Sequence, residues 1–175
     1  MIRLFRILIS VLFRYYFIII LKKSNNQIFI CDIDNTIFNT WIEWKKSKDY
    51  SFVFSNTKPL TNSINFVKKN IKDNNKNLIF LTVRPLNQYL KTLTSIKKIF
   101  GNNNKVIILK NVDEKLWYYN YLLKNEKSFL VFDDLSYNHE NGEVKYYDKL
   151  INFLKNNNVK HYDYSFILKL NEENS

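Results

Sequence analysis

The sequence predicts an α/β fold: a three-layer, Rossmann-like parallel sheet preceded by an N-terminal amphipathic helix. Short apolar runs typical of strands alternate along the chain with segments of helical period. The first strand, over residues 27–32, is a continuous apolar run, as expected of a parallel strand covered on both faces. This alternation implies right-handed crossovers, with ligands at the carboxyl ends of the strands.

Composition and charge narrow the class of protein. The chain has 175 residues, 46% of them hydrophobic, and only two glycines and two prolines, which excludes a disordered or fibrous chain. Cys31 is the single cysteine, so an internal disulfide and a Cys-rich metal site are excluded. The formal charge of +11 suggests an anionic partner, whether nucleic acid, anionic lipid or a phosphorylated substrate.

Residues 1–23 predict an amphipathic helix at a membrane interface. The apolar run is about as long as a membrane span, but Arg14 lies inside it and would cost about 2.5–3.5 kcal/mol at a bilayer centre. On a helix, Ser10 and Arg14 fall on one narrow stripe with Arg3, and Arg6 lies to one side. The basic residues expected among anionic headgroups are Arg3, Arg6, Arg14, Lys22 and Lys23.

Two other placements of this helix stay open: a spanning anchor, and a helix packed against protein. Residues 24–26 are expected to form a linker to a catalytic domain over residues 27–175. The expected location is cytoplasmic, peripheral on the inner face of a membrane.

The remaining elements follow in order. Residues 37–58 have no clear helical period and predict a small flap or cap insert, in which residues 51–54 could join a hairpin. A helix begins near Pro59, and Gly101 ends a later one. The other predicted strands are residues 78–82, 106–109, 129–133 and, less regularly, 161–170; the other predicted helices are residues 86–100, 113–124 and 146–156.

Polar side chains follow three of the predicted strands. Asp32 and Asp34 end the first strand, and a period of two places both on one side of the backbone. Thr82 and Arg84 end the second strand, and the acidic pair at residues 133–134 ends the fourth. Carboxylates without His or Cys ligands suit a hard cation such as Mg²⁺, which commonly acts on phosphate.

These strand ends resemble the haloacid dehalogenase (HAD) superfamily, in its phosphatase branch. Asp32-Ile33-Asp34-Asn35-Thr36 matches the D-x-D-x-T signature. Phe80-Leu81-Thr82-Val83-Arg84-Pro85 is similar to the second motif, and Phe132-Asp133-Asp134 to the fourth, acidic motif. The likeness extends over residues 27 to about 155 and leaves out the N-terminal helix.

The resemblance implies a role for each matching residue. Asp32 would be the nucleophile that takes the phosphoryl group. Asp34 would act as general acid and base, and its backbone carbonyl would join Asp32 on Mg²⁺. Thr82 would bind the phosphoryl oxygens. Asp134 would bind Mg²⁺ directly, and Asp133 through a water molecule.

The family's phosphate-binding lysine has two candidates. Lys110 ends the third strand, whereas Lys115 begins the next helix. We favour Lys115, because its position at a helix start suits the motif better. Possible substrate contacts are Arg84, Trp41, Trp44 and Asn138, whereas His139, His161 and Cys31 are expected to serve packing or the surface.

The expected activity is that of a Mg²⁺-dependent phosphomonoesterase. The chain leaves no room for a large cap, and family members without one have open sites that suit large or surface-presented substrates. With an interfacial helix, this favours a phosphorylated sugar on a lipid-linked glycan, or a phospholipid. A nucleic-acid end phosphatase and a catalytically silent HAD-like binding protein stay open as alternatives.

Overall fold

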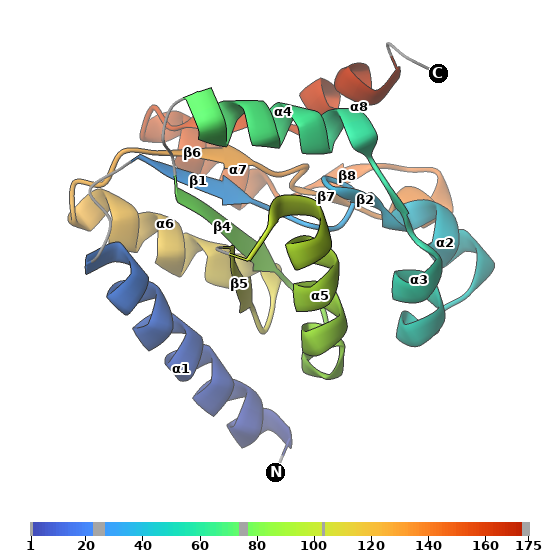
Figure 1. The fold of residues 1–175 in the computed structure, drawn as a ribbon, viewed down its shortest axis with the longest axis horizontal. Coiled ribbons are helices and arrows are strands. Elements are labelled where there is room, and N and C mark those ends of the chain that lie inside the picture. The colour runs from blue at the N-terminus through green and yellow to red at the C-terminus, as the bar shows by residue number, and fades with distance from the viewer. Residues whose placement is uncertain (1, 23–26, 74–76, 103, 173–175) are drawn as a thin grey trace.

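The central sheet of this chain is parallel throughout. The computed structural model describes residues 2–22, 27–73, 77–102 and 104–172. Its five-stranded sheet has the order β5-β4-β1-β6-β9 (Figure 1). The strands are β1 (Ile28–Cys31), β4 (Asn77–Thr82), β5 (Lys105–Ile108), β6 (Phe129–Phe132) and β9 (Lys160–Tyr162). The prediction of an α/β fold with a Rossmann-like parallel sheet is confirmed.

Helices cover both faces of the sheet, which makes three layers. One face packs against α1 (Ile2–Lys22), α6 (Lys115–Lys124) and α7 (Asp148–Asn156). The other packs against α4 (Thr61–Asp73), α5 (Tyr89–Phe100) and α8 (Tyr164–Glu172). Successive side chains of β1 enter opposite cores, Ile28 and Ile30 on one side and Phe29 and Cys31 on the other. This two-sided burial explains why β1 is a continuous apolar run.

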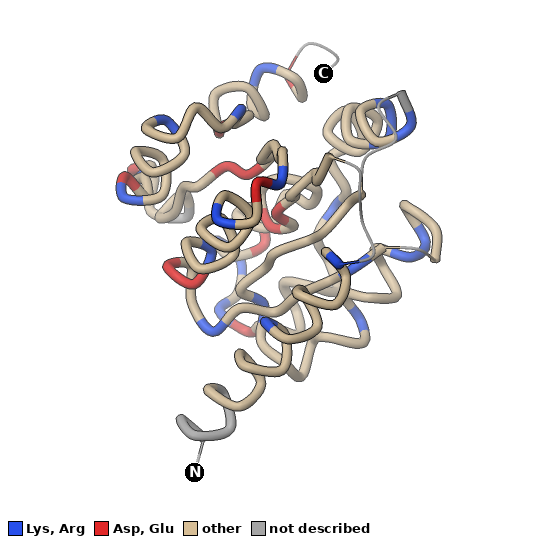
Figure 2. The backbone as a smooth tube through the Cα atoms, turned by 90° about the vertical axis from the view of Figure 1, so that its left-hand side faces the viewer, with Lys and Arg blue, Asp and Glu red and all other residues tan. Residues whose placement is uncertain are grey.

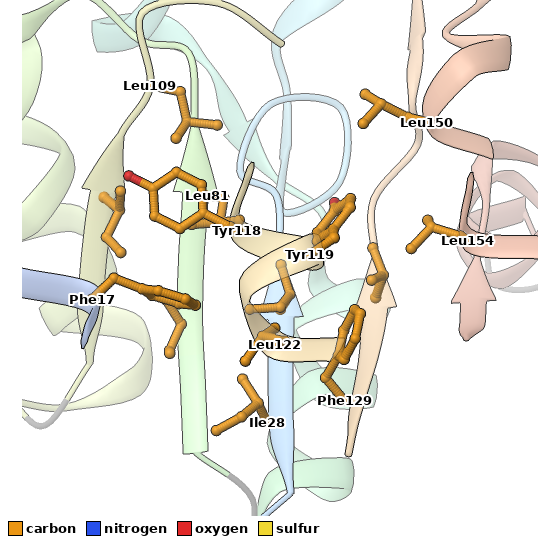
Figure 3. Close-up of a cluster of buried hydrophobic side chains, with 14 of the residues drawn as sticks. Phe17, Ile28, Leu81, Leu109, Tyr118, Tyr119, Leu122, Phe129, Leu150 and Leu154 are labelled. Carbon is orange, nitrogen blue, oxygen red and sulfur yellow. The ribbon is translucent and has the colours of Figure 1, made fainter. Parts of the chain in front are cut away.

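Helix α1 is packed as part of this domain. Phe17 and Leu21 are buried in the same core as Tyr118 and Leu122 of α6 (Figure 3). The rings of Phe17 and Tyr118 meet edge to face with centroids 4.9 Å apart. Among the described residues, no helix has both the length and the apolar character needed to cross a bilayer. The predicted linker, residues 24–26, lies outside the described residues.

The segment after β1 forms a small helical flap. A hairpin of β2 (Phe38–Asn39) and β3 (Lys58–Pro59) carries α2 (Thr40–Lys46) and α3 (Tyr50–Asn56). The prediction that residues 51–54 join a hairpin is wrong, because they lie in α3. Ring contacts among Trp44, Tyr50 and Phe54 join the two short helices, at centroid distances of 4.9–6.1 Å. These tertiary contacts stabilise helices too short to show a period.

The end of the chain differs from the prediction in the same way. The strand expected over residues 161–170 ends at Tyr162, and α8 follows it. Asp163 explains the change, because its carboxylate accepts hydrogen bonds from the Phe166 N–H at 3.0 Å and the Ser165 hydroxyl at 2.8 Å. The remaining short elements are β7 (Ser136–Tyr137), β8 (Lys145–Tyr146), and the 3₁₀ turns η1 (Leu86–Gln88), η2 (Val112–Glu114) and η3 (His139–Asn141).

Candidate active site

The carboxyl ends of the central strands bring the predicted acidic residues together. Strand β1 lies between β4 and β6, and Cys31 is level with Phe80 and Phe132 on the two neighbours. Asp32 and Asp133 therefore leave adjacent strands at the same height. The Asp32 N–H donates to the Phe132 carbonyl at 2.9 Å, which continues the ladder up to the site. Strands β4 and β5 lie on one side of β1, and strands β6 and β9 lie on the other. The strand order therefore reverses beside β1, and open parallel sheets bind ligands at such a point.

Three buried carboxylates form an acidic cluster, defined as Asp32, Asp133 and Asp134. One oxygen of each lies within 4.8 Å of the others. Lys115 Nζ lies 2.9 Å from Asp32 Oδ1 and 2.6 Å from Asp133 Oδ2. These four residues line one cavity, which we call the acidic cavity. Lys110 is exposed and does not line it. Of the two candidate lysines, Lys115 therefore reaches the predicted nucleophile.

The charges of this site do not balance. Three carboxylates face one ammonium, so two negative charges lack a lysine or arginine partner in the cluster when all three are ionised. His139 Nε2 lies 3.6 Å from Asp134 Oδ2. Burial raises the pKa of Asp32 and of Asp134, because desolvation disfavours the ionised form. Burial lowers the pKa of Lys115, but Asp133 and Asp32 raise it by more. A set of carboxylate oxygens short of two positive charges fits a hard divalent cation such as Mg²⁺.

Asp34 points to a different partner. Arg84 holds it with two nitrogens, Nε at 3.0 Å from Oδ2 and Nη2 at 2.7 Å from Oδ1. Thr82 Oγ1 lies 3.5 Å from the same carboxylate. Arg84 is itself fixed by the Thr92 hydroxyl at 3.3 Å and by the Phe54 ring, 4.3 Å from its guanidinium carbon. Arg84 was predicted as a substrate contact, and the structure places it where it orients Asp34.

The turn that follows Asp34 is hydrogen-bonded to the flap and to the loop after β6. Asn35 has a φ of +57°, in the left-handed region that asparagine tolerates better than most residues. Its side-chain oxygen accepts hydrogen bonds from the Thr40 hydroxyl at 2.9 Å and the Trp41 N–H at 3.0 Å, at the start of α2. Thr36 Oγ1 accepts from the Asp134 N–H at 3.2 Å. The end of the D-x-D-x-T motif thus positions the flap and the β6 loop.

Two residues that sequence reasoning left out of the site stand beside Asp134. The Ser136 hydroxyl donates to Asp134 Oδ2, and His139 Nε2 lies 2.8 Å from Ser136 Oγ. His139 is buried, with 6% of its surface exposed, and its ring centroid lies 6.5 Å from that of Trp41. The only signal was their proximity in sequence to the acidic pair. His161 contacts the site from β9, with Nε2 2.8 Å from the Asp133 carbonyl oxygen.

Two predicted substrate contacts have other partners. The Asn138 side chain donates to the Glu143 carbonyl at 2.8 Å within its own loop, and it does not line the acidic cavity. Trp44 packs against Tyr50 in the flap. Contact of Trp41 or Trp44 with a substrate stays a prediction.

Two polar residues of α1, Ser10 and Arg14, contact the rest of the domain. Arg14 Nη2 lies 3.0 Å from Glu114 Oε1, and its guanidinium lies over the Trp117 ring at 4.8 Å. The Ser10 hydroxyl donates to the same Glu114 oxygen. Arg14 therefore has a partner within the domain, the buried Glu114 carboxylate, and its contact with lipid headgroups stays a prediction. Lys22 is exposed, whereas Lys23 and the side chains of Arg3 and Arg6 lie outside the described residues.

The opposite side of α1 is exposed and apolar. Seven of its large side chains have 37–65% of their surface exposed. We call this surface the α1 outer face; its members are Ile7, Leu8, Val11, Leu12, Tyr15, Tyr16 and Ile19. Figure 2 shows most of α1 in tan, which marks uncharged residues.

No family model, curated protein or solved structure matches this chain.

Proposed function

We propose that this chain is a Mg²⁺-dependent phosphomonoesterase of the HAD superfamily that works through an aspartyl-phosphate. The observation that carries the proposal is the acidic cluster, in which Lys115 joins Asp32 to Asp133 while Asp34 stands two residues from the nucleophile. Structural ion pairs rarely leave two buried negative charges uncompensated. A site built for a cation and a phosphoryl group accounts for that imbalance.

Asp32 is the group proposed to attack phosphorus. A bond forms between its carboxylate oxygen and phosphorus, and the ester P–O bond breaks. Asp34 gives its proton to the leaving oxygen and then takes one from the water that hydrolyses the aspartyl-phosphate. The two Arg84 contacts fix the orientation of the Asp34 carboxylate, which lines the same cavity as Asp32.

The remaining polar groups hold the phosphate and the cation. Thr82 lines the same cavity as Asp32 and Asp34, and its hydroxyl is proposed to bind the phosphoryl oxygens. Asp32 and Asp134 would hold Mg²⁺, together with the Asp34 carbonyl and, through water, Asp133. When bound, the cation would offset repulsion between the nucleophile and the anionic substrate.

The α1 outer face supports a place at a membrane surface. Exposed apolar patches of this kind mark interaction sites, and the sequence of this helix contains basic residues and no acid. We propose that the α1 outer face meets the acyl boundary on the cytoplasmic side of a membrane. The side of α1 that carries Ser10 and Arg14 faces the domain instead. A phosphate on a lipid-linked sugar or on a lipid is the substrate proposed there.

Phosphate release from a panel of substrates tests the activity. Phosphorylated sugars, lipid phosphates, nucleotides and 5′-phosphorylated oligonucleotides are incubated with the full chain in MgCl₂ or in EDTA. We expect Mg²⁺-dependent release that Asp32→Asn lowers by at least about 10³-fold. Asp148→Asn, the same change at an exposed carboxylate, should leave the rate unchanged.

The outcomes separate the alternatives. Full activity of Asp32→Asn, with its fold checked by circular dichroism, would refute the nucleophile. Release only from oligonucleotide ends, with a steep dependence on salt, would assign the nucleic-acid alternative. Mg²⁺ binding without release from any ester would assign a silent binding protein.

A further inference from the structure

A second cavity lies beside the acidic one. It has a volume of about 490 Å³, whereas the cavity of the acidic cluster has about 120 Å³. We call it the α1 cavity, because the first half of α1 forms one wall. The walls are mostly apolar: Ile9, Val83, Pro85, Leu86, Ile108 and Leu109. Its size lies in the range of about 300–1,000 Å³ that is usual for sites of small organic ligands.

The two cavities are lined in part by the same segments of the chain. Val83 lines both, and Thr82 and Arg84 on either side of it line one each. The second connection is the segment from β5 to the start of α6, where Lys110 lines the α1 cavity and Val112 and Lys115 line the acidic one. A molecule whose phosphate meets Asp32 can therefore place its organic group in the adjoining, larger and more apolar cavity.

The charges of the α1 cavity suit an anionic ester. Arg84 and Lys110 line it, and no acidic side chain does. Arg84 is engaged by Asp34, whereas Lys110 forms no ion pair with any residue that the structure describes. Positive charge at the polar side and apolar walls elsewhere complement a molecule that is anionic at one end and apolar at the other.

Exposed apolar residues of α1 share a side of the helix with Ile9, which lines the cavity. Leu12 and Tyr16 follow Ile9 by three and seven residues, which places them on adjoining turns of the same side of the helix. Leu12 is 56% exposed and Tyr16 is 40% exposed. An apolar chain that outgrows the cavity thus meets further apolar surface instead of water.

We infer that the α1 cavity binds the apolar organic group of the substrate, which is an amphiphilic phosphate monoester with an alkyl chain. This rests on the proposed function, because the phosphate end is taken to lie at Asp32. It deepens that proposal by assigning the part of the protein that selects the organic group.

A chain-length series tests the inference. The full chain is assayed in MgCl₂ with butyl, hexyl and octyl monophosphate below their micelle concentrations, with a sugar phosphate as the polar comparison. We expect kcat/KM to rise by about fourfold for each added methylene that becomes buried. Equal kcat/KM for the three esters, or a preference for the sugar phosphate, would overturn the inference.

Two variants locate the effect. Ile9→Asp places a carboxylate on the cavity wall and should flatten the chain-length series, because kcat/KM for octyl phosphate falls more than kcat/KM for butyl phosphate. Leu8→Asp introduces an aspartate at the preceding residue, which belongs to the α1 outer face, and it should keep the series intact. If Ile9→Asp fails to fold, Leu86→Trp, which fills the cavity, should also flatten the series. A series unchanged in both cavity variants would overturn the assignment.

A binding measurement tests this inference independently of the proposed phosphatase activity. Octylphosphonate, which cannot be hydrolysed at its P–C bond, is titrated into the Asp32→Asn protein by calorimetry, with butylphosphonate as the comparison. Tighter binding of the octyl compound that Ile9→Asp abolishes supports the cavity even if no ester is hydrolysed. Equal binding of the two compounds would overturn it even if phosphatase activity is found.

Discussion

The acidic cluster and helix α1 depart from the usual distribution of side chains in opposite directions. In the cluster, ionisable groups are buried: Asp32, Asp133 and Asp134 are 1–7% exposed. On α1, large apolar groups are exposed, and Leu12 shows more than half of its surface. Buried charge without a counterion and apolar surface in water each cost free energy in the isolated chain. Under the proposed function, each region is one half of an interaction, with a cation and phosphate in one case and an apolar partner in the other.

The difference between them lies in how each is held. The cluster is fixed by strand ends and by a lysine that bonds two carboxylates, so its geometry is rigid before any ligand arrives. The α1 outer face is held only from behind, through Phe17, Leu21 and the Arg14 pair. Changes in the cluster should therefore affect stability and activity together, whereas changes on the outer face should affect binding alone.

Lys115→Met should have the largest effect. The change leaves Asp32 and Asp133 without their counterion, and breaking such a buried pair costs about 3–5 kcal/mol of unfolding free energy. We expect phosphate release to fall at least about 10³-fold, because the nucleophile loses its partner. Urea denaturation and the phosphate assay measure the two effects.

Lys110→Met is the matched control, since it removes an exposed lysine five residues before Lys115. It should change the free energy of unfolding by no more than about 0.5 kcal/mol. The double variant Lys115→Met/Asp133→Asn should be more stable than Lys115→Met alone. Equal destabilisation by the two lysine variants would contradict the geometry of the cluster.

Mg²⁺ should stabilise the protein more at higher pH. Burial raises the pKa of Asp32 and Asp134 above the ordinary value of 3.8. The folded chain therefore binds more protons than the unfolded one, and without metal this contribution to stability is lost as pH rises from about 4 through the raised pKa values. Mg²⁺ binds the ionised carboxylates, so its stabilisation grows over the same range and reaches about 2.7 kcal/mol at 100 times its Kd.

Thermal unfolding at pH 5 and pH 8, each in EDTA and in MgCl₂, measures this effect. The rise in Tm on adding Mg²⁺ should be larger at pH 8 and absent in Asp134→Asn. An equal rise at both pH values, or in that variant, would place the ion elsewhere.

Arg84→Lys should have a smaller and more selective effect. Lysine cannot reproduce the two-nitrogen contact that orients Asp34. We expect about a tenfold loss in kcat for alkyl phosphates, whose leaving oxygen needs a proton, and a smaller loss for p-nitrophenyl phosphate, whose leaving group does not. Equal losses for the two esters would mean that Arg84 does not act through Asp34.

Changes on the α1 outer face should have little effect on stability. Leu8→Ser/Leu12→Ser/Tyr15→Ser should change the free energy of unfolding by about 1 kcal/mol or less, because all three side chains are exposed. Co-sedimentation with vesicles that contain anionic lipid should nevertheless fall at least about tenfold. Leu90→Ser, at an exposed apolar residue of α5, should leave vesicle binding unchanged. Undiminished binding of the triple variant would remove the proposed membrane contact.

Much of the site could be predicted because it lies at strand ends. A continuous apolar run followed by Asp32 specifies both a buried strand and where its carboxylate emerges, and the same holds for Phe132 and Asp133. The two short flap helices and α8 were harder to predict. Their stability comes from ring contacts and from the Asp163 cap rather than from a periodic pattern.

The sequence by itself determined the sheet, the order of its strands along the chain and the carboxylates at their ends, because period and apolar runs are local properties. Only the tertiary structure decided which partner each charge has. Arg14 could face lipid or protein until Glu114 was placed beside it, and Lys115 rather than Lys110 reached Asp32 because of where α6 begins. Pairing across about 100 residues of chain depends on distance in space, which no local pattern specifies.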